Sequence, residues 1–515
     1  MVPPNDLNEL LSPEEAQAFL YNNDPPPEED LPKIRAFIAK AQDGLEALNA
    51  ILLPMLMQRA MFEEILRKHT PLVLPIRRVP PEVWAEIFRW NLVDNQPITE
   101  CDPPSPPPWL PAQVCRSWRA AALAESTLWS CVYIHYLLIP EPLELEEQLR
   151  RSRNASLDVF FYWKEDYAEY LLELLDLLVA QSSRWERATI YWAETNPGMV
   201  HSMSRIAGQL PRLKHLTSIA NKPRAIPRDL FADASSLREV LLTETEEPFG
   251  RHVPDSPLLS APWAQITRFR VRLGPEPVLE ILRAMHQLRE CGIYKRSGDA
   301  AHDFFATTST MVLLPHLRRL CVWDARFLRV LEAPRLQYLM LDATGGQDAA
   351  SSFIRRSGCQ VLGLKIFDWG PDAVINLLGN IPGLKYLELG INIRPGYNRE
   401  DSDENLRTMF AALGSASSPS LCPDLTSFII ERPSAIFGRD IYQRFFEMIV
   451  SRWHPGTPQG LKSVVFLDQA HQYYRGVQSL EESHQQWIQE LRADGLDIRF
   501  DPYEDKLLNS DMELP

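Results

Sequence analysis

The chain has little of what secreted, metal-binding and membrane-spanning proteins carry. Its seven cysteines are scattered over 515 residues and never form a C-x-x-C pair, so the sequence predicts neither a disulfide framework nor a zinc module. No run of about 18 apolar residues occurs, and no basic, apolar leader opens the chain. We therefore expect a soluble protein of the cytoplasm or the nucleus that does not associate with membranes.

Positive charge is also scarce, because 53 Lys and Arg against 68 Asp and Glu leave a net charge of −15. Nucleic acids demand a basic face, so no nucleic-acid partner is expected. The sequence also lacks a glycine-rich phosphate loop, the G-x-S-x-G and H-E-x-x-H motifs, and any His or Cys cluster at metal-ligand spacing. The sequence therefore predicts a protein that binds no cofactor or metal and is not an enzyme. The distant alternative is a hydrolase, which would need a nucleophile and a base that are far apart in the sequence and are brought together by the fold.

What the chain does contain is a globular composition, 45% hydrophobic and 23% charged, over a length that suits about two to four structural units. Residues 1–32 mix acids with prolines and offer too few apolar groups to offset the entropy of ordering, so we predict disorder there. Residues 504–515 form a short C-terminal tail.

A helix is predicted over residues 33–70, where apolar side chains from Ile34 to Ile65 recur at helical spacing. Proline inside a helix removes a hydrogen bond, so Pro54 predicts two helical pieces rather than one rod. One interpretation is a short coiled coil for self-association. The other is a helix that packs on the neighbouring module, which we favour because a kink at Pro54 would end a sustained heptad.

Two further amphipathic patterns follow. Pro81 suits the opening turn of a helix, where its missing N–H has no partner anyway, and Glu82 favours the positive helix end. Val83, Ile87 and Phe88 then draw an apolar stripe along this helix. Such a stripe has to be covered.

The second pattern follows a proline-rich insert, residues 95–108, which we interpret as an exposed loop of low thermodynamic cost. Leu110, Val114 and Trp118 repeat the helical period, and Leu128-Trp129 opens a short third element. A module of roughly 55 residues buries too little apolar surface to be stable on its own, so a partner is implied.

Three pieces of this module, residues 76–137, resemble the F-box, most closely its version in mushroom-forming fungi: VPPEV with Ile87-Phe88, then VCRxWR, then LW. Two features depart from the family pattern, namely Val79 in place of leucine and the insert. The resemblance implies that the module binds the Skp-type adaptor of an SCF-type cullin–RING ubiquitin ligase. The adaptor contacts that it implies are Val79, Pro80, Pro81, Glu82, Val83, Ile87, Phe88, Leu110, Val114, Cys115, Trp118, Arg119, Leu128 and Trp129. The alternative is a helical hairpin packed inside the protein's own core.

Residues 143–503 repeat lines of the form L-x-x-L-x-L, and the first eight lines start 19–29 residues apart, the period of a leucine-rich repeat. Such units cannot bury their apolar side alone, so strands stack in parallel on the inside and helices cover the outside. The lines begin at Leu213, Leu237, Ile266, Leu288, Leu317, Leu336, Val361, Leu384, Leu425 and Leu461.

The positions between the buried ones would face a protein target. Side chains alternate sides along a strand, so three arginines spaced by two lie on one face and could contact an acidic or phosphorylated segment. The alternative interpretation is that the same residues form a solvated strand face without a binding role. The candidate target contacts are Arg268, Arg270, Arg272, Arg319, Tyr338 and Tyr386.

The sequence thus predicts an α/β protein: an N-terminal helical F-box module followed by an irregular leucine-rich-repeat solenoid. The predicted function is that of the substrate-recognition subunit of an SCF-type cullin–RING ubiquitin ligase, with an unidentified protein target. The alternative is a leucine-rich-repeat scaffold without a link to ubiquitination, in which the helical hairpin caps the first repeat.

Overall fold

The structure is a computed structural model in which the chain divides into two compact units, Met1–Trp84 and Ala85–Pro515. Each unit is described by itself. The residues that the structure describes are 26–92, 109–135, 139–162, 168–192, 197–220, 227–244, 259–294, 305, 310–342, 347–367, 370–390, 399–414, 421–432, 439–453, 460–468 and 482–502. Of the residues 1–32 predicted to be disordered, 1–25 lie outside them, as do the insert 95–108 and the tail 504–515. The prediction is wrong for Leu31 and Pro32, which open a helix.

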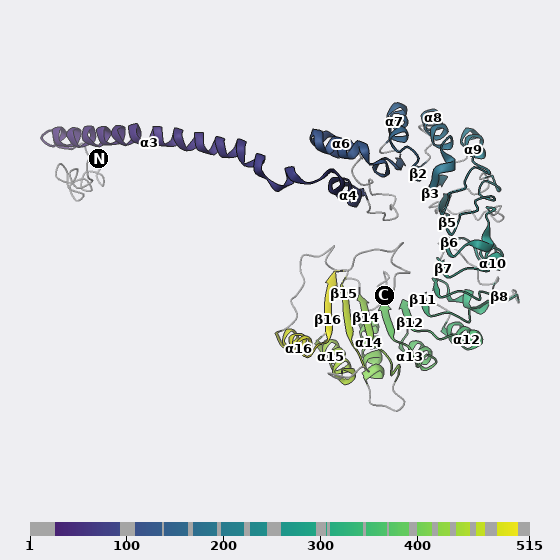
Figure 1. Ribbon diagram of the computed structural model, residues 1–515. Coiled ribbons are helices and arrows are strands. Elements are labelled where there is room, and N and C mark those ends of the chain that lie inside the picture. The colour runs from purple at the N-terminus through teal and green to yellow at the C-terminus, as the bar shows by residue number, and fades with distance from the viewer. Residues whose placement is uncertain are drawn as a thin grey trace. The chain divides into compact units, whose positions relative to one another are not determined.

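The first unit is built on one long helix, α3 (Leu31–Val73), followed by the 3-10 turn η1 (Pro75–Arg78) (Figure 1). The helix continues for 43 residues through Pro54. The prediction of two helical pieces is therefore wrong: one lost hydrogen bond does not outweigh neighbours such as Leu, Met and Ala, which have high helix propensity.

Helix α4 (Pro81–Leu92) leads to the short helices α5 (Trp109–Val114) and α6 (Arg116–Ala124), the 3-10 turn η2 (Ser126–Trp129) and strand β1 (Cys131–Ile134). The second predicted helix is thus two helices. Cys115 separates them because its backbone is extended, and its Sγ accepts a hydrogen bond from the Trp118 N–H at 3.4 Å as the N-cap of α6.

In the described residues, the rest of the second unit is organised by one sheet of 14 strands, all parallel and in chain order. After β1 the strands are β2 (Leu157–Tyr162), β3 (Trp185–Trp192), β4 (His215–Ala220), β5 (Glu239–Glu244), β6 (Arg268–Arg272), β7 (Glu290–Ile293), β9 (Arg319–Val322), β11 (Tyr338–Asp342), β12 (Gly363–Phe367), β13 (Tyr386–Gly390), β14 (Ser427–Arg432), β15 (Ser463–Asp468) and β16 (Asp497–Pro502). A separate parallel pair joins β8 (Val312–Leu313) to β10 (Leu331–Glu332).

Helices follow many of these strands and lie along one face of the sheet (Figure 1). We call the opposite face of the sheet its inner face. The helices are α7 (Pro142–Arg151), α8 (Ala168–Val179), α9 (Pro197–Ser204), α10 (Pro275–Ala284), α12 (Gln347–Ser357), α13 (Pro371–Gly379), α14 (Arg399–Gly414), α15 (Arg439–Arg452) and α16 (Glu482–Ala493); the 3-10 turns are η4 (Ser182–Arg184), η6 (Trp263–Gln265) and η7 (Ala325–Arg329).

The predicted α/β class with parallel strands is confirmed, since each of the ten L-x-x-L-x-L lines contains a strand of the sheet. The sequence reasoning missed β1 and β16. Because β1 pairs with β2, the sheet begins inside the residues assigned to the helical module, before residue 143.

One continuous core lies between the sheet and its helices. The first, fourth and sixth residues of a line supply it: Leu384, Leu387 and Leu389 are all fully buried. The strand register aligns these positions, so Leu364 of β12 and Leu387 of β13 stand opposite each other. Side-chain alternation then turns the residues between them to the inner face.

Candidate protein-binding surfaces

The consecutive helices α4, α5 and α6 expose large apolar side chains. Ile87 and Trp90 lie three residues apart on α4, Leu110 and Val114 lie four apart on α5, and Leu123 is on α6. Residues three or four apart share one face of a helix. We call these five residues the open apolar set. On α4, the earlier Val83 is exposed as well.

The opposite side of α4 holds the module together. Phe88 is buried and meets the ring of Trp118 edge to face, with ring centroids 5.1 Å apart. Arg119 donates from Nε to the carbonyl oxygen of Ala112 at 2.8 Å, which ties α6 to α5. Phe88 and Trp118 therefore pack α4 against α6, although the sequence placed both among the adaptor contacts.

Trp129 is buried where the helices meet the first strand. Its Nε1 donates to the carbonyl oxygen of Ala122 at 2.8 Å, and its ring lies 5.3 Å from the ring of Trp109. The guanidinium of Arg151 on α7 covers the ring at 4.4 Å. Trp129 and the buried Leu128 thus fasten the helical module to the first repeat, and neither faces solvent.

The predicted adaptor contacts therefore fall into groups by exposure. Val79 and Trp118 are half-buried, and the buried ones are Phe88, Leu128 and Trp129. The exposed ones are Pro80, Pro81, Glu82, Val83, Ile87, Leu110, Val114, Cys115 and Arg119. Sequence reasoning missed Trp90 and Leu123. The spacing of Trp90 from Ile87 could have found the first of these.

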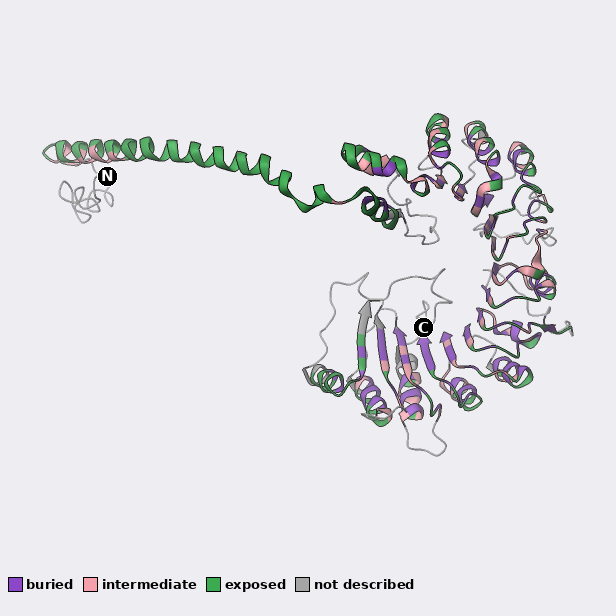
Figure 2. Cartoon of the chain, in the orientation of Figure 1, coloured by how far each residue is buried: buried purple, intermediate pink, exposed green. Residues whose placement is uncertain are grey.

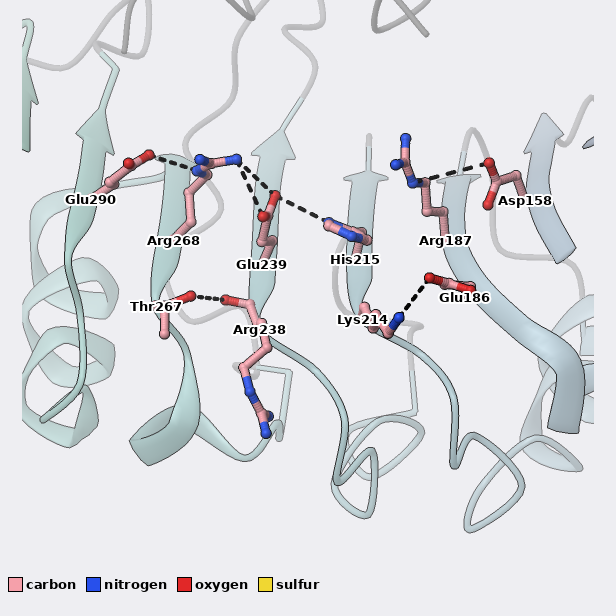
Figure 3. A network of polar contacts seen from close by, with 10 residues as sticks. All are labelled: Asp158, Glu186, Arg187, Lys214, His215, Arg238, Glu239, Thr267, Arg268 and Glu290. Carbon is pink, nitrogen blue, oxygen red and sulfur yellow. Dashed lines mark hydrogen bonds and ion pairs between the residues drawn. The ribbon is translucent and has the colours of Figure 1, made fainter. Parts of the chain in front are cut away.

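On the inner face, residues at or near the start of successive strands form a row of acidic and basic side chains (Figure 3). The register places Asp158, Arg187, His215, Glu239, Arg268, Glu290 and Arg319 side by side. We call this line of residues the first row.

Ion pairs cross the strands along the first row. The Nε of Arg268 lies 2.6 Å from Glu290, and its Nη1 lies 3.2 Å from Glu239. Glu239 also lies 3.1 Å from Nδ1 of His215. Burial raises the pKa of Glu239, but the hydrogen bond from His215 and the charge of Arg268 outweigh this and hold the pKa below its usual value.

These ion pairs change the interpretation of the predicted arginine site. Arg268, Arg270 and Arg272 do share the inner face, because Phe269 and Val271 between them are buried. Two carboxylates neutralise Arg268, however, so the strand does not present three free positive charges. A row of alternating charge replaces the expected positive notch at this point.

Beyond Glu290 the inner face becomes aromatic. The guanidinium of Arg319 lies 5.2 Å above the ring of Tyr338, which lies flat over the backbone of Gly363. A Cβ at Gly363 would overlap that ring. In the same way Phe367 lies over Gly390. Glycine on the neighbouring strand thus lets each ring lie across the sheet.

Tyr386 sits differently from Tyr338. Its hydroxyl donates to Glu388 at 2.5 Å, and Nζ of Lys365 lies 2.8 Å from the same carboxylate and 3.7 Å from Glu431. Tyr386 and Glu388 are buried, and burial followed by the charge of Glu388 raises the pKa of Tyr386. Tyr386 therefore stabilises a buried ionic cluster, which leaves Tyr338 as the more accessible of the two predicted tyrosines.

Among the described residues, no group of three or more His, Cys, Asp or Glu side chains could hold a metal ion. Within the same parts of the chain, no helix has the length and apolar character that crossing a membrane requires.

No protein-family model matches this chain, and a search of curated proteins finds no match either. Among solved structures, the chain is similar to one described as the crystal structure of a TLR13–ssRNA13 complex. The sequences are 11% identical, the TM-score is 0.25, and the match covers 55% of this chain. It spans 35%, about a third, of the other chain's length.

Proposed function

We propose that the chain is the substrate-recognition subunit of an SCF-type cullin–RING ubiquitin ligase. In this proposal α4–α6 bind a Skp-type adaptor, and the parallel sheet with its helices is a leucine-rich-repeat solenoid whose inner face holds a protein target. The observation that carries the proposal is the open apolar set. Five large apolar side chains stay uncovered on three short helices that already have a packed interior behind them.

The energetic argument concerns the cost of leaving these side chains in water. Fully burying one large apolar side chain that starts exposed is worth about 1.5–3 kcal/mol. The five side chains are between 37% and 73% exposed, so each contributes part of that value when a partner covers it. The resemblance of the VPPEV, VCRxWR and LW pieces to the F-box is the reason for proposing a Skp-type adaptor as this partner. Phe88 and Trp129 would then act by shaping the surface rather than by touching the adaptor, because both are buried.

In this mechanism the chain itself catalyses no reaction. The adaptor side fixes the chain to the ligase, and the inner face fixes the target, so target lysines meet the ubiquitin-charged enzyme at high effective concentration. The first row would select a target of complementary alternating charge, since Arg268 is already paired and offers no isolated positive charge.

The chain offers a matched pair of valines for the test. Val114 on α5 is 61% exposed and Val450 on α15 is 59% exposed, so aspartate at either position disturbs no core. We expect the full-length chain to co-purify with a Skp-type adaptor and cullin. Val114→Asp should reduce adaptor recovery at least tenfold, which corresponds to about 1.4 kcal/mol, whereas Val450→Asp should leave it unchanged.

Undiminished adaptor recovery by Val114→Asp would contradict the proposed surface. A wild-type chain that recovers no adaptor or cullin would instead favour a second candidate, a leucine-rich-repeat scaffold in which the helices cap the sheet. One observation favours that candidate. The ring of Trp129 is enclosed by Trp109, Arg151 and the Ala122 carbonyl, so the helices are firmly joined to the first repeat, as a cap would be.

A further inference from the structure

Helix α3 carries an apolar seam with coiled-coil spacing. Its apolar residues alternate at intervals of four and three, which is the spacing of the a and d positions of a heptad. Arg59 and His69 occupy two positions of this series. The others are Ile34, Ile38, Ala41, Leu45, Leu48, Leu52, Met55, Phe62, Leu66 and Val73.

Two structural facts make this spacing meaningful. The helix is continuous from Leu31 to Val73, so the series runs along its whole length. On a straight helix such a series drifts by about 20° per heptad, which a left-handed supercoil of two paired helices compensates. Pro54 lies off the seam, between Leu52 and Met55, and does not interrupt it. The helix also contains no buried residue (Figure 2). Ile34 and Ala41 are half-buried, whereas the apolar seam residues from Leu45 to Val73 are all exposed.

We propose that α3 pairs along this seam with α3 of a second copy of the chain. A helix with heptad spacing fits an identical helix, because each seam side chain enters a hole formed by four residues of the partner. Ten apolar seam residues at about 60–120 Å² each would bury roughly 1,200–2,400 Å² over both helices. That area reaches the size of a specific, stable interface.

The charges agree with self-pairing. Arg59 is the one basic residue on the seam besides His69, and Glu63 of the same helix neutralises it with Oε1 2.8 Å from Nε. The positions flanking the seam carry only Arg35 and Glu63 as charged residues, so two parallel helices bring no like charges together there. The flanking positions are Arg35, Phe37, Gln42, Gly44, Asn49, Ile51, Leu56, Gln58, Glu63, Ile65, Thr70 and Leu72.

This pairing does not depend on the adaptor, so it is tested on the purified full-length chain alone. Size-exclusion chromatography with light scattering should give twice the chain mass of 59.0 kDa at micromolar concentration. Replacing two seam residues, Leu52→Glu with Met55→Glu, should raise the dissociation constant on the order of 1,000-fold, because four charges would enter the dimer seam.

The control uses the same residue types one or two positions away. Leu53 and Met57 are 62% and 68% exposed, against 54% and 61% for Leu52 and Met55, but they lie off the seam. Leu53→Glu with Met57→Glu should therefore keep the dimer. A monomeric wild-type chain would overturn the proposal. Equal dissociation of both double variants would overturn it too.

Discussion

The glycine at position 390 offers a sharp test of how the inner face is built. Phe367 of β12 stands opposite Gly390 of β13 and lies over its backbone, where an added Cβ would overlap ring carbons Cδ1 and Cε1. The same ring stacks on Trp323 with centroids 5.7 Å apart and planes 14° from parallel. Gly390→Ala must therefore displace a buried ring that has a second partner.

The magnitude follows from three contributions to the free energy of unfolding. Overpacking at a buried site costs about 1–3 kcal/mol. Loss of the stack with Trp323 adds about 0.5–1.5 kcal/mol, and the lower entropy of the unfolded alanine chain returns about 0.4–1 kcal/mol. We expect Gly390→Ala to destabilise the protein by about 0.5–4 kcal/mol.

The control is Gly383→Ala, because nothing lies within 4 Å of a Cβ built at Gly383. This variant should be neutral or more stable by up to about 1 kcal/mol. Urea unfolding followed by tryptophan fluorescence measures both variants. A cost for Gly390→Ala no larger than that of Gly383→Ala would refute the reasoning. So would a cost that persists in a Phe367→Ala background, where the obstructing ring is gone.

Two further predictions concern the first row and the module's joint. Arg268→Ala should cost less than about 1 kcal/mol at pH 7, since the pair is partly exposed. Because the pKa of Glu239 is lowered in the folded protein, the stabilisation by the Arg268–Glu239 pair is present above the ordinary pKa of Glu and is lost as the pH falls through the lowered value. Urea unfolding at several pH values should therefore show that the difference in stability between Arg268→Ala and wild type disappears at low pH. The control variant Arg289→Ala, at an exposed position, should show no such pH dependence. Trp129→Phe should cost about 1–3 kcal/mol in the same assay, because it leaves the buried carbonyl of Ala122 without its 2.8 Å donor; an unchanged unfolding midpoint would contradict that role.

The strands were the most predictable part of the molecule. Each L-x-x-L-x-L line is a local pattern, and its buried positions, such as Leu384, Leu387 and Leu389, follow from alternation within one strand. The shared face of Arg268, Arg270 and Arg272 followed from the same rule.

The candidate surfaces were only partly predictable. The sequence named Ile87 and Phe88 together, but the first is exposed and the second buried, and only the contact with Trp118 separates them. Trp129 is part of the F-box-like motif, but it is buried and connects the helices to the start of the sheet. A motif identifies residues that matter without saying whether they touch a partner or support the surface that does.

The sequence by itself determined the parallel α/β sheet, the order of its strands and the apolar character of α3 and of the helices α4–α6. Tertiary structure alone decided that Arg268 is neutralised, that Tyr386 is buried and that β1 joins the sheet. The physical reason is the range of the interactions. Periodicity is a property of neighbours along the chain, whereas charge pairing and burial depend on the register between strands that lie tens of residues apart.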